Sequence, residues 1–174
     1  MDGWGGHAPG RGDVMTEVVV MVGLPGCGKS AWVKRHLAAS HVVVSRDLWP
    51  NALRRDLRRR RAIGDALADG LDVVVDDINP SPLERAPVIS IAREHGARVR
   101  AVYIDRPLRE CLERNAARSG PAAVPVAGVL AAARRLVRPT PGEGFDQVDT
   151  VEEPDEAGTV EEPDDSVATL PPGS

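Results

Sequence analysis

A short glycine-rich segment constrains the fold of this chain more than any other feature. Residues 23–30 read GLPGCGKS, which fits the pattern G-x-x-x-x-G-K-[ST]. The segment follows an apolar run at 17–22 and precedes a helix-length stretch at 29–39. Glycines let such a turn curl until successive backbone N–H groups face an anion at the helix N-terminus. A glycine turn that binds nothing is the alternative, but the motif and both flanking elements favour a phosphate-binding loop.

We therefore expect a nucleotide to bind at this loop. Lys29 supplies a cation for the β- and γ-phosphates, and the Ser30 hydroxyl is an expected ligand of Mg²⁺. The expected nucleotide-binding residues of the loop are Gly23, Leu24, Pro25, Gly26, Cys27, Gly28, Lys29 and Ser30. The loop by itself does not reveal whether the γ-phosphoryl group goes to water or to another acceptor.

Short apolar runs alternate with helix-length segments between residues 16 and 151. Strands are expected at 17–22, 41–44, 71–77, 99–105 and 147–151, and helices at 29–39, 52–69, 82–95, 107–118 and 126–137. The first four strand runs are nearly continuous in Val and Ile, which is typical of parallel strands covered on both faces. This alternation predicts a three-layer α/β domain with a mostly parallel central sheet.

The two ends of the chain differ from this domain in composition. Residues 1–15 are Gly-rich, residues 152–174 are acidic and repetitive, and both are expected to be disordered. The net charge of −4 hides this division. All 22 basic residues precede Asp149, whereas nine of the 26 acidic residues lie at or after Asp149. We therefore expect a basic domain at 16–151 followed by an acidic tail.

Composition also limits where the protein acts. No apolar run approaches the roughly 20 residues that cross a bilayer, and the N-terminus lacks the order of a signal peptide. We expect a cytoplasmic protein with no membrane contact. Cys27 and Cys111 are the only cysteines, too few for a disulfide framework or a cysteine metal site.

Carboxylates follow the second and third predicted strands. The carboxyl ends of parallel strands form a crevice where ligands bind, beside the phosphate loop. Asp47, in the segment SRD, is expected there to orient an attacking hydroxyl and accept its proton, although a helix N-cap is an alternative role. One of Asp76 and Asp77 is expected to hold Mg²⁺, and we favour Asp77 for an active-site role. Adjacent residues of a strand point to opposite faces, so both acids cannot do the same work.

Two arginines lie near the end of the fourth predicted helix. Arg114 and Arg118 are spaced i and i+4, so they share a helix face. The segment is expected to form a helical lid in which both arginines contact the nucleotide. A solvated surface is the alternative, since exposed helical arginines commonly have no further role.

Taken in order, these elements resemble the P-loop kinase domain of the polynucleotide 5′-hydroxyl kinases of phage and of eukaryotic DNA repair. The matching segments run from about residue 17 to residue 151 and read GLPGCGKSAW, SRD, DDINP, ERNAAR, AVPV and PTPGEGFDQV. The resemblance implies a P-loop kinase fold that binds ATP and Mg²⁺ at Lys29 and Ser30. It further implies that Asp47 is the general base toward a 5′-hydroxyl and that Arg118 is a lid arginine on the donor phosphates.

The acceptor side departs from the family pattern. The phage-type enzyme carries an arginine three residues after its catalytic aspartate, where this chain has Pro50, and Arg54 is the candidate replacement. Six arginines between residues 54 and 61 are expected to meet phosphates of the acceptor, although only part of the run can face it. A solvated helix face is the alternative. The expected acceptor residues are Arg46, Trp49, Arg54, Asp77 and Asn79, with Trp49 stacking on a terminal base or simply packing.

The sequence thus predicts ATP-dependent phosphorylation of 5′-hydroxyl ends of DNA or RNA. Two alternatives remain: a small-molecule or zeta-toxin-like kinase, and a nucleotide-binding regulatory module without turnover. The arginine-rich helix and the PTPGEGF segment favour nucleic acid. No Asp-x-Asp-Gly-Thr motif of the related phosphatase domain occurs, so the chain is expected to lack 3′-phosphatase activity, and any phosphatase or ligase activity is expected to come from a separate chain.

Overall fold

The computed structural model describes residues 15–50 and 53–152. The leader expected at 1–15 and the acidic tail expected at 152–174 therefore lie outside the described residues, except for Met15 and Glu152. The domain limits of 16 and 151 stay a prediction. Within the described ranges, no helix is both long and apolar enough to cross a membrane.

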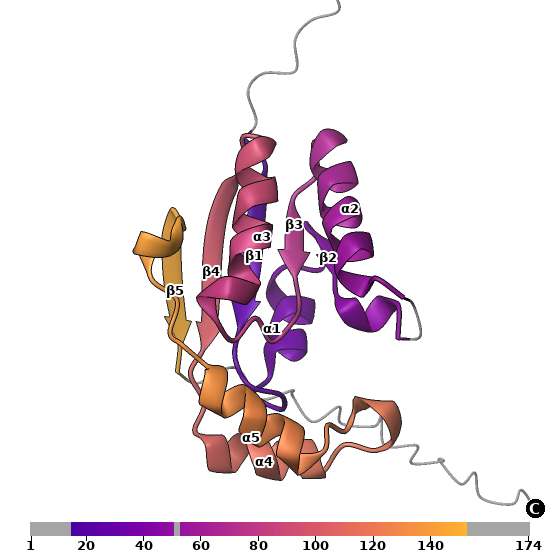
Figure 1. Ribbon diagram of the computed structural model, residues 1–174, viewed down its shortest axis with the longest axis vertical. Coiled ribbons are helices and arrows are strands. Elements are labelled where there is room, and N and C mark those ends of the chain that lie inside the picture. The colour runs from indigo at the N-terminus through magenta and orange to yellow at the C-terminus, as the bar shows by residue number, and fades with distance from the viewer. Residues whose placement is uncertain (1–14, 51–52, 153–174) are drawn as a thin grey trace, which may run out of the picture.

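A five-stranded sheet forms the centre of the molecule (Figure 1). The strands lie in the order β2-β3-β1-β4-β5, and every neighbouring pair is parallel. Their bounds are β1 (Glu17–Val22), β2 (Val42–Val44), β3 (Val73–Val75), β4 (Arg98–Ile104) and β5 (Gln147–Val151). All five occur where the apolar runs predict them.

Helices cover both faces of this sheet, which gives the predicted three layers. Alternate residues of β1 point to opposite faces: Val18 and Val20 pack against α2 and α3, whereas Val19 and Met21 pack on the side of α1, α4 and α5. The helices are α1 (Lys29–His36), α2 (Arg55–Ala68), α3 (Pro82–Glu94), α4 (Leu108–Ala116) and α5 (Val126–Arg135). Three short 3₁₀ helices are η1 (Arg46–Leu48), η2 (Gly120–Ala122) and η3 (Pro141–Glu143).

One strand is less covered than its sequence predicts. The core residues of β1 and β3 are fully buried, but Val42 and Val43 of β2 keep 37% and 36% of their surface exposed. The expectation that all four valine-rich strands are covered on both faces is therefore wrong for β2. The reason is its position, because β2 is an edge strand with a single neighbour.

A buried arginine holds the C-terminal part of the domain against α3. Arg85 has no exposed surface, and its guanidinium donates to both carboxylate oxygens of Glu143 at 2.7 and 2.8 Å. It also donates to the backbone carbonyls of Asn79 and Val137. Glu143 belongs to the PTPGEGF segment and also forms a capping box with Thr140. This segment therefore contributes directly to the packing of the domain.

The parallel arrangement brings three chain segments to one edge of the sheet. The glycine loop leaves the carboxyl end of β1, η1 follows β2, and Asp76 and Asp77 follow β3. The hairpin of α4 and α5 lies beyond the same end of the sheet (Figure 1). Ligand crevices of open α/β sheets form at this edge.

Candidate active site

The glycine loop packs tightly against α4. Gly26 has a φ of 82°, a left-handed conformation that favours glycine. A Cβ added at this position would overlap the carbonyl oxygen of Cys111 and lie 3.1 Å from the backbone nitrogen of Asn115. Glycine is thus required here both for its backbone angles and for the close approach of the helix.

Arginines hold the loop from its outer side. Arg106 donates to the carbonyl of Cys27 at 3.2 Å, and Arg114 donates to the carbonyl of Gly26 at 3.1 Å. The Lys29 ammonium donates to the carbonyls of Gly23 and Leu24 at 2.9 and 2.8 Å. These contacts fix the carbonyl groups of the loop.

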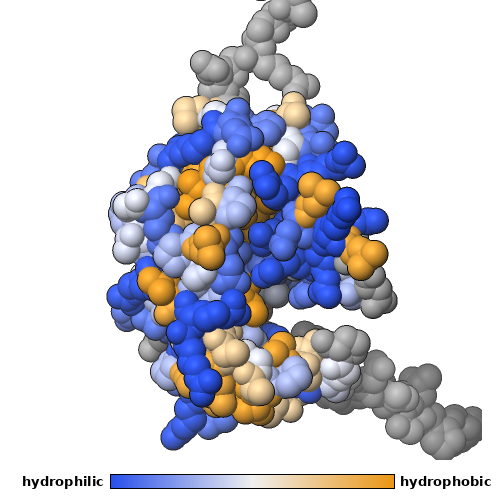
Figure 2. Space-filling view, viewed as in Figure 1, coloured by the Kyte–Doolittle hydropathy of each residue, from blue (hydrophilic) through white to orange (hydrophobic). Residues whose placement is uncertain are grey.

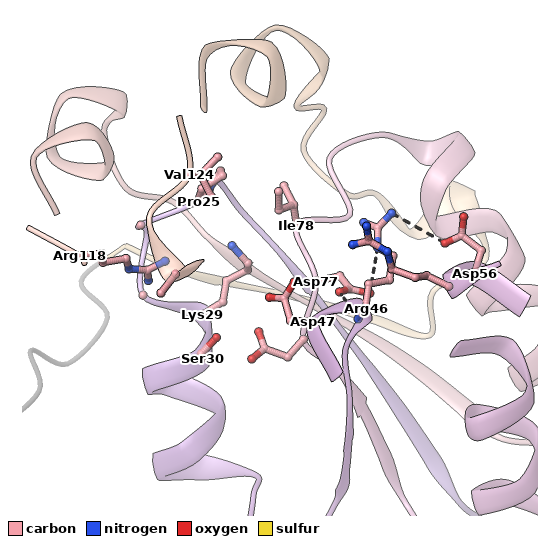
Figure 3. A pocket seen from close by; sticks show the side chains of 15 residues that line it. Pro25, Lys29, Ser30, Arg46, Asp47, Asp56, Asp77, Ile78, Arg118 and Val124 are labelled. Atoms are coloured by element: carbon pink, nitrogen blue, oxygen red, sulfur yellow. Dashed lines mark hydrogen bonds and ion pairs between the residues drawn. The ribbon is translucent and has the colours of Figure 1, made fainter. Parts of the chain in front are cut away.

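The loop forms one wall of a cleft of about 720 Å³. Lys29, Ser30, Asp47, Asp76 and Arg118 all line this cleft, although they come from separate parts of the sequence. In Figure 3, Arg118 lies on one side of Lys29 and Asp47 lies on the other. Leu24 and Cys27 are buried in the core on the α1 side, so they contribute through their backbone, whereas Pro25, Gly26 and Gly28 line the cleft.

Asp76 lies beside the cation and hydroxyl of the loop. Burial raises the pKa of its carboxyl, and a hydrogen bond from Ser30 and the charge of Lys29 oppose that effect. Its Oδ1 atom is buried and has no hydrogen-bond partner among the described residues. A buried carboxylate oxygen without a partner, next to a Ser hydroxyl, is a donor set that fits Mg²⁺, which prefers hard oxygen ligands.

Asp77 has a different environment although it is the next residue. Its Oδ2 accepts a hydrogen bond from Arg59 at 2.8 Å, within an ion pair in which both side chains are 5% exposed. Its Oδ1 accepts from the Ser45 hydroxyl and from the Arg46 N–H. Because both carboxylate oxygens of Asp77 accept hydrogen bonds within the protein, the geometry favours Asp76 as the acid that holds the metal. Asp77 instead holds η1 in place through Ser45 and Arg46.

The structure removes the alternative capping role for Asp47. Ser45 is the N-cap of η1, and its side chain accepts a hydrogen bond from the Asp47 N–H. The Asp47 side chain is exposed on the cleft wall, and no described residue donates a hydrogen bond or forms an ion pair with its carboxylate. It is therefore placed to accept a hydrogen bond from a ligand.

The hairpin that carries Arg118 has a rigid base. Asn115, which is 3% exposed, donates to the Val124 carbonyl at 2.6 Å and accepts from the Val124 N–H at 3.0 Å. Arg118 follows α4, and its exposed side chain lines the cleft. Arg114 instead bonds to Gly26 and is absent from the cleft lining among the described residues. Only one of the two predicted lid arginines thus reaches the cleft.

Three predicted acceptor residues lie elsewhere. Asn79 has no exposed surface, and its side-chain amide donates to the carbonyl of Met21. The predicted contact of Asn79 with substrate is therefore wrong, and its role is structural. Trp49 and Arg54 line a second cleft, on another face of α2. Arg55, the first residue of α2, lines the main cleft instead, whereas Arg54 precedes the helix in a left-handed conformation with a φ of 61°. Arg46 does line the main cleft, and its predicted contact with an acceptor stays a prediction.

Substitution of Gly26 by Ala is expected to destabilise the loop. The added Cβ meets backbone atoms of α4, which cannot move away as a flexible side chain can. The strained backbone angle and the overlap together predict a loss of about 1 to 3 kcal/mol of stability and weaker nucleotide binding. Urea unfolding and titration with a fluorescent ATP analogue measure the two effects. Gly96→Ala is the control, since its φ is also positive but no atom lies within 4 Å of the added Cβ; equal losses in both variants would contradict a role for the close packing of α4.

Replacing Asp76 by Asn is expected to raise stability and abolish turnover. The folded pKa of Asp76 lies above its ordinary value of 3.8, so the folded state binds more protons than the unfolded state between these two values. Stability therefore falls as pH rises through this window, and the penalty persists at neutral pH. Asn removes the penalty, which predicts a gain of about 1 kcal/mol in urea unfolding at pH 7. A loss of stability at pH 7 would show that the carboxylate is stabilising.

Comparisons with known proteins identify the family and the fold of this chain. A family model described as AAA domain matches residues 18–139, more than half of the chain. The chain belongs to this family. This AAA domain is 28% identical over 142 residues to a protein of Acanthamoeba polyphaga mimivirus named "Putative bifunctional polynucleotide phosphatase/kinase". The match covers 78% of the chain but 33% of that relative, so the chain spans about one third of the relative's length.

Solved structures show the same fold. A fungal RNA kinase aligns with a TM-score of 0.60 at 19% identity, over 83% of this chain and 78% of its own. A sugar kinase from Janibacter sp. HTCC2649 aligns with a TM-score of 0.57 at 20% identity, over 79% and 84%. The predicted three-layer P-loop kinase fold and the similarity to polynucleotide kinases are thus confirmed. The fold implies a nucleotide at the glycine loop, and it is shared by kinases with different acceptors.

Proposed function

We propose that this AAA domain is an ATP- and Mg²⁺-dependent kinase that phosphorylates the 5′-hydroxyl end of DNA or RNA. The observation that carries the proposal is the shared cleft. It combines a phosphate loop with a carboxylate, Asp47, whose oxygens have no partner among the described residues. Phosphoryl transfer needs a group that orients the attacking nucleophile, and the Asp47 carboxylate is available to orient an acceptor hydroxyl.

Each residue of the cleft has a distinct part in the transfer. Asp47 orients the acceptor hydroxyl and accepts its proton as the oxygen bonds to the γ-phosphorus and the bond to the leaving ADP oxygen breaks. Lys29 and Arg118 stabilise negative charge on the phosphate oxygens from two sides. Ser30 and Asp76 would hold Mg²⁺, which when bound neutralises charge on those oxygens. Asp77 and Ser45 keep η1, and with it Asp47, in position.

Charge supports a polynucleotide acceptor. Arg46 and Arg55 line the cleft together with Asp47, and Arg46 also lies 3.8 Å from the carboxylate of Asp56 and 3.6 Å from that of Asp77. Guanidinium groups recognise phosphates well, and a polynucleotide end places phosphates close to its hydroxyl, which a sugar does not. The name of the mimivirus relative and the resemblance of the SRD segment, which carries Asp47, to polynucleotide kinases support the same acceptor.

Transfer of labelled γ-phosphate tests the proposal. The protein is incubated with Mg²⁺ and γ-labelled ATP, and the acceptors are 5′-hydroxyl oligodeoxynucleotides, 5′-hydroxyl oligoribonucleotides, nucleosides and sugars. We expect labelled oligonucleotides and no label on oligonucleotides that already carry a 5′-phosphate. Label on a sugar or nucleoside alone would identify a small-molecule kinase, and nucleotide binding without any transfer would identify a regulatory module.

A further inference from the structure

A second cleft, of about 510 Å³, lies along α2 and is not used by the chemistry described above. We call it the α2 groove. Its lining includes Trp49 and Leu57, the arginines Arg54, Arg58 and Arg61, and one acid, Asp65. The spacing of these α2 residues places them on one helix face, whereas Arg55 and Arg59 point to the main cleft and to Asp77.

The arginines of the α2 groove differ from others in the domain. Arg59 and Arg85 are buried and paired with carboxylates. Within the described part of the chain, no carboxylate forms an ion pair with Arg54, Arg58 or Arg61. Three exposed guanidinium groups in one groove, against a single acid, create a local positive charge that the described residues do not neutralise. Such a groove attracts an anionic ligand.

The groove also exposes apolar surface. Trp49 packs partly against the core and also lines the groove, and Leu53 and Leu57 keep 90% and 57% of their surface exposed. Figure 2 shows hydrophobic spots within the hydrophilic surface over α2. A ligand for this groove must therefore offer both negative charge and flat apolar faces. Unpaired nucleotides do so, because their phosphates pair with arginine and their bases stack on tryptophan and guanidinium planes.

The α2 groove begins close in the chain to residues that line the main cleft. Asp47 lines the main cleft and Trp49, two residues later, lines the groove. At the start of α2, Arg55 and Asp56 line the main cleft, whereas Leu57 and the N-cap residue Arg54 line the groove. A strand whose 5′-hydroxyl lies at Asp47 can thus continue across this turn into the groove.

We propose that the α2 groove binds the nucleotides that follow the 5′-terminal nucleotide of a single-stranded acceptor. Arg58 and Arg61 contact the phosphates, and Trp49 stacks on an unpaired base. This inference rests on the proposed function. It adds that the enzyme prefers longer acceptor strands and requires unpaired bases near the 5′ end. A duplex hides the base faces that Trp49 needs.

The test compares acceptors of two lengths. The value of kcat/KM is measured for a nucleoside 3′-phosphate and for an eight-nucleotide single strand, both with a 5′-hydroxyl. The double variant Arg58→Ala/Arg61→Ala is compared with Arg60→Ala, which removes an arginine of the same helix that lines neither cleft. We expect the ratio of the long to the short acceptor to fall at least tenfold in the double variant and to stay at the wild-type value in Arg60→Ala. An equal ratio in both variants would overturn the proposal.

A binding measurement separates this inference from the proposed function. Anisotropy of a labelled eight-nucleotide strand is followed with a non-hydrolysable ATP analogue present, so that turnover is not needed. We expect weaker binding in the double variant and a salt slope reduced by about 0.7 for each phosphate that the protein no longer neutralises. Strand binding that depends on Arg58 and Arg61, without any phosphorylation, would support the α2 groove as a strand-binding site and would contradict the proposed kinase function. Binding of a polyglutamate peptide of equal charge as tightly as the strand, or of a blunt duplex more tightly, would reject the groove as a single-strand site.

Discussion

Replacing Asp47 by Asn is expected to lower kcat for phosphoryl transfer by about 10²- to 10⁴-fold. Asn has nearly the same size, so η1 should keep its shape, which depends on the Ser45 side chain and on Asp77 rather than on the Asp47 carboxylate. The amide cannot accept the proton of the acceptor hydroxyl. Nucleotide affinity should change little, since the loop residues that contact phosphates are untouched.

Single-turnover transfer to a 5′-hydroxyl oligonucleotide measures this loss, and titration with a fluorescent ATP analogue measures nucleotide affinity. Asp69→Asn is the matched control, because Asp69 is exposed at the opposite end of α2. It should leave both quantities near wild type. A kcat for Asp47→Asn within a few fold of wild type would exclude a base at this position, whatever the acceptor.

Removing the Asp77 carboxylate is expected to destabilise the domain by about 3 to 5 kcal/mol. The Asp77→Ala variant removes the 2.8 Å partner of the buried Arg59 and leaves it only the exposed Asp56 at 3.7 Å. A buried charge that loses its buried partner costs more than the pair itself contributes. It also removes the acceptor for Ser45 and for the Arg46 N–H, so η1 loses its attachment. Urea unfolding at pH 7 measures the change in the free energy of unfolding.

A paired variant tests the cause. In Arg59→Met/Asp77→Leu no charge is left uncompensated, so most of the lost stability should return. Turnover should stay low in both variants, because η1 is not held and Asp47 is misplaced. A destabilisation below about 1 kcal/mol in Asp77→Ala would mean that the buried pair is not an important support of the domain.

Local patterns were enough to predict the elements of this fold. The Val- and Ile-rich runs predict four of the strands and a weaker pattern predicts β5, while a motif of eight residues between a strand and a helix predicts the phosphate loop. The order of these elements also predicts which strand ends meet, since parallel strands end at one edge. For this reason Asp47 could be placed beside Lys29 and Ser30 of the loop, whereas Arg118 was selected from its position after the fourth helix and from the family resemblance. All four line one cleft.

Choices between neighbouring residues could not be made in this way. Asp76 and Asp77 are equivalent in sequence, and only the orientation of the chain after β3 directs Asp76 to Ser30 and Asp77 to Arg59. In the same way, one arginine of the run on α2 is buried while its neighbours line two different clefts. The rotation of α2 about its axis against the sheet decides which arginine is buried and which lines each cleft.

The sequence by itself determined the fold class, the phosphate loop and the set of candidate catalytic groups, because each depends on short-range periodicity or on a contiguous motif. Only the tertiary structure decided which acid faces the loop, that Asn79 and Arg114 support the backbone, and that Trp49 lies in a separate groove. These assignments depend on contacts between residues far apart in the chain. The free energy of burying or pairing a side chain depends on those contacts, and a local sequence pattern does not determine them.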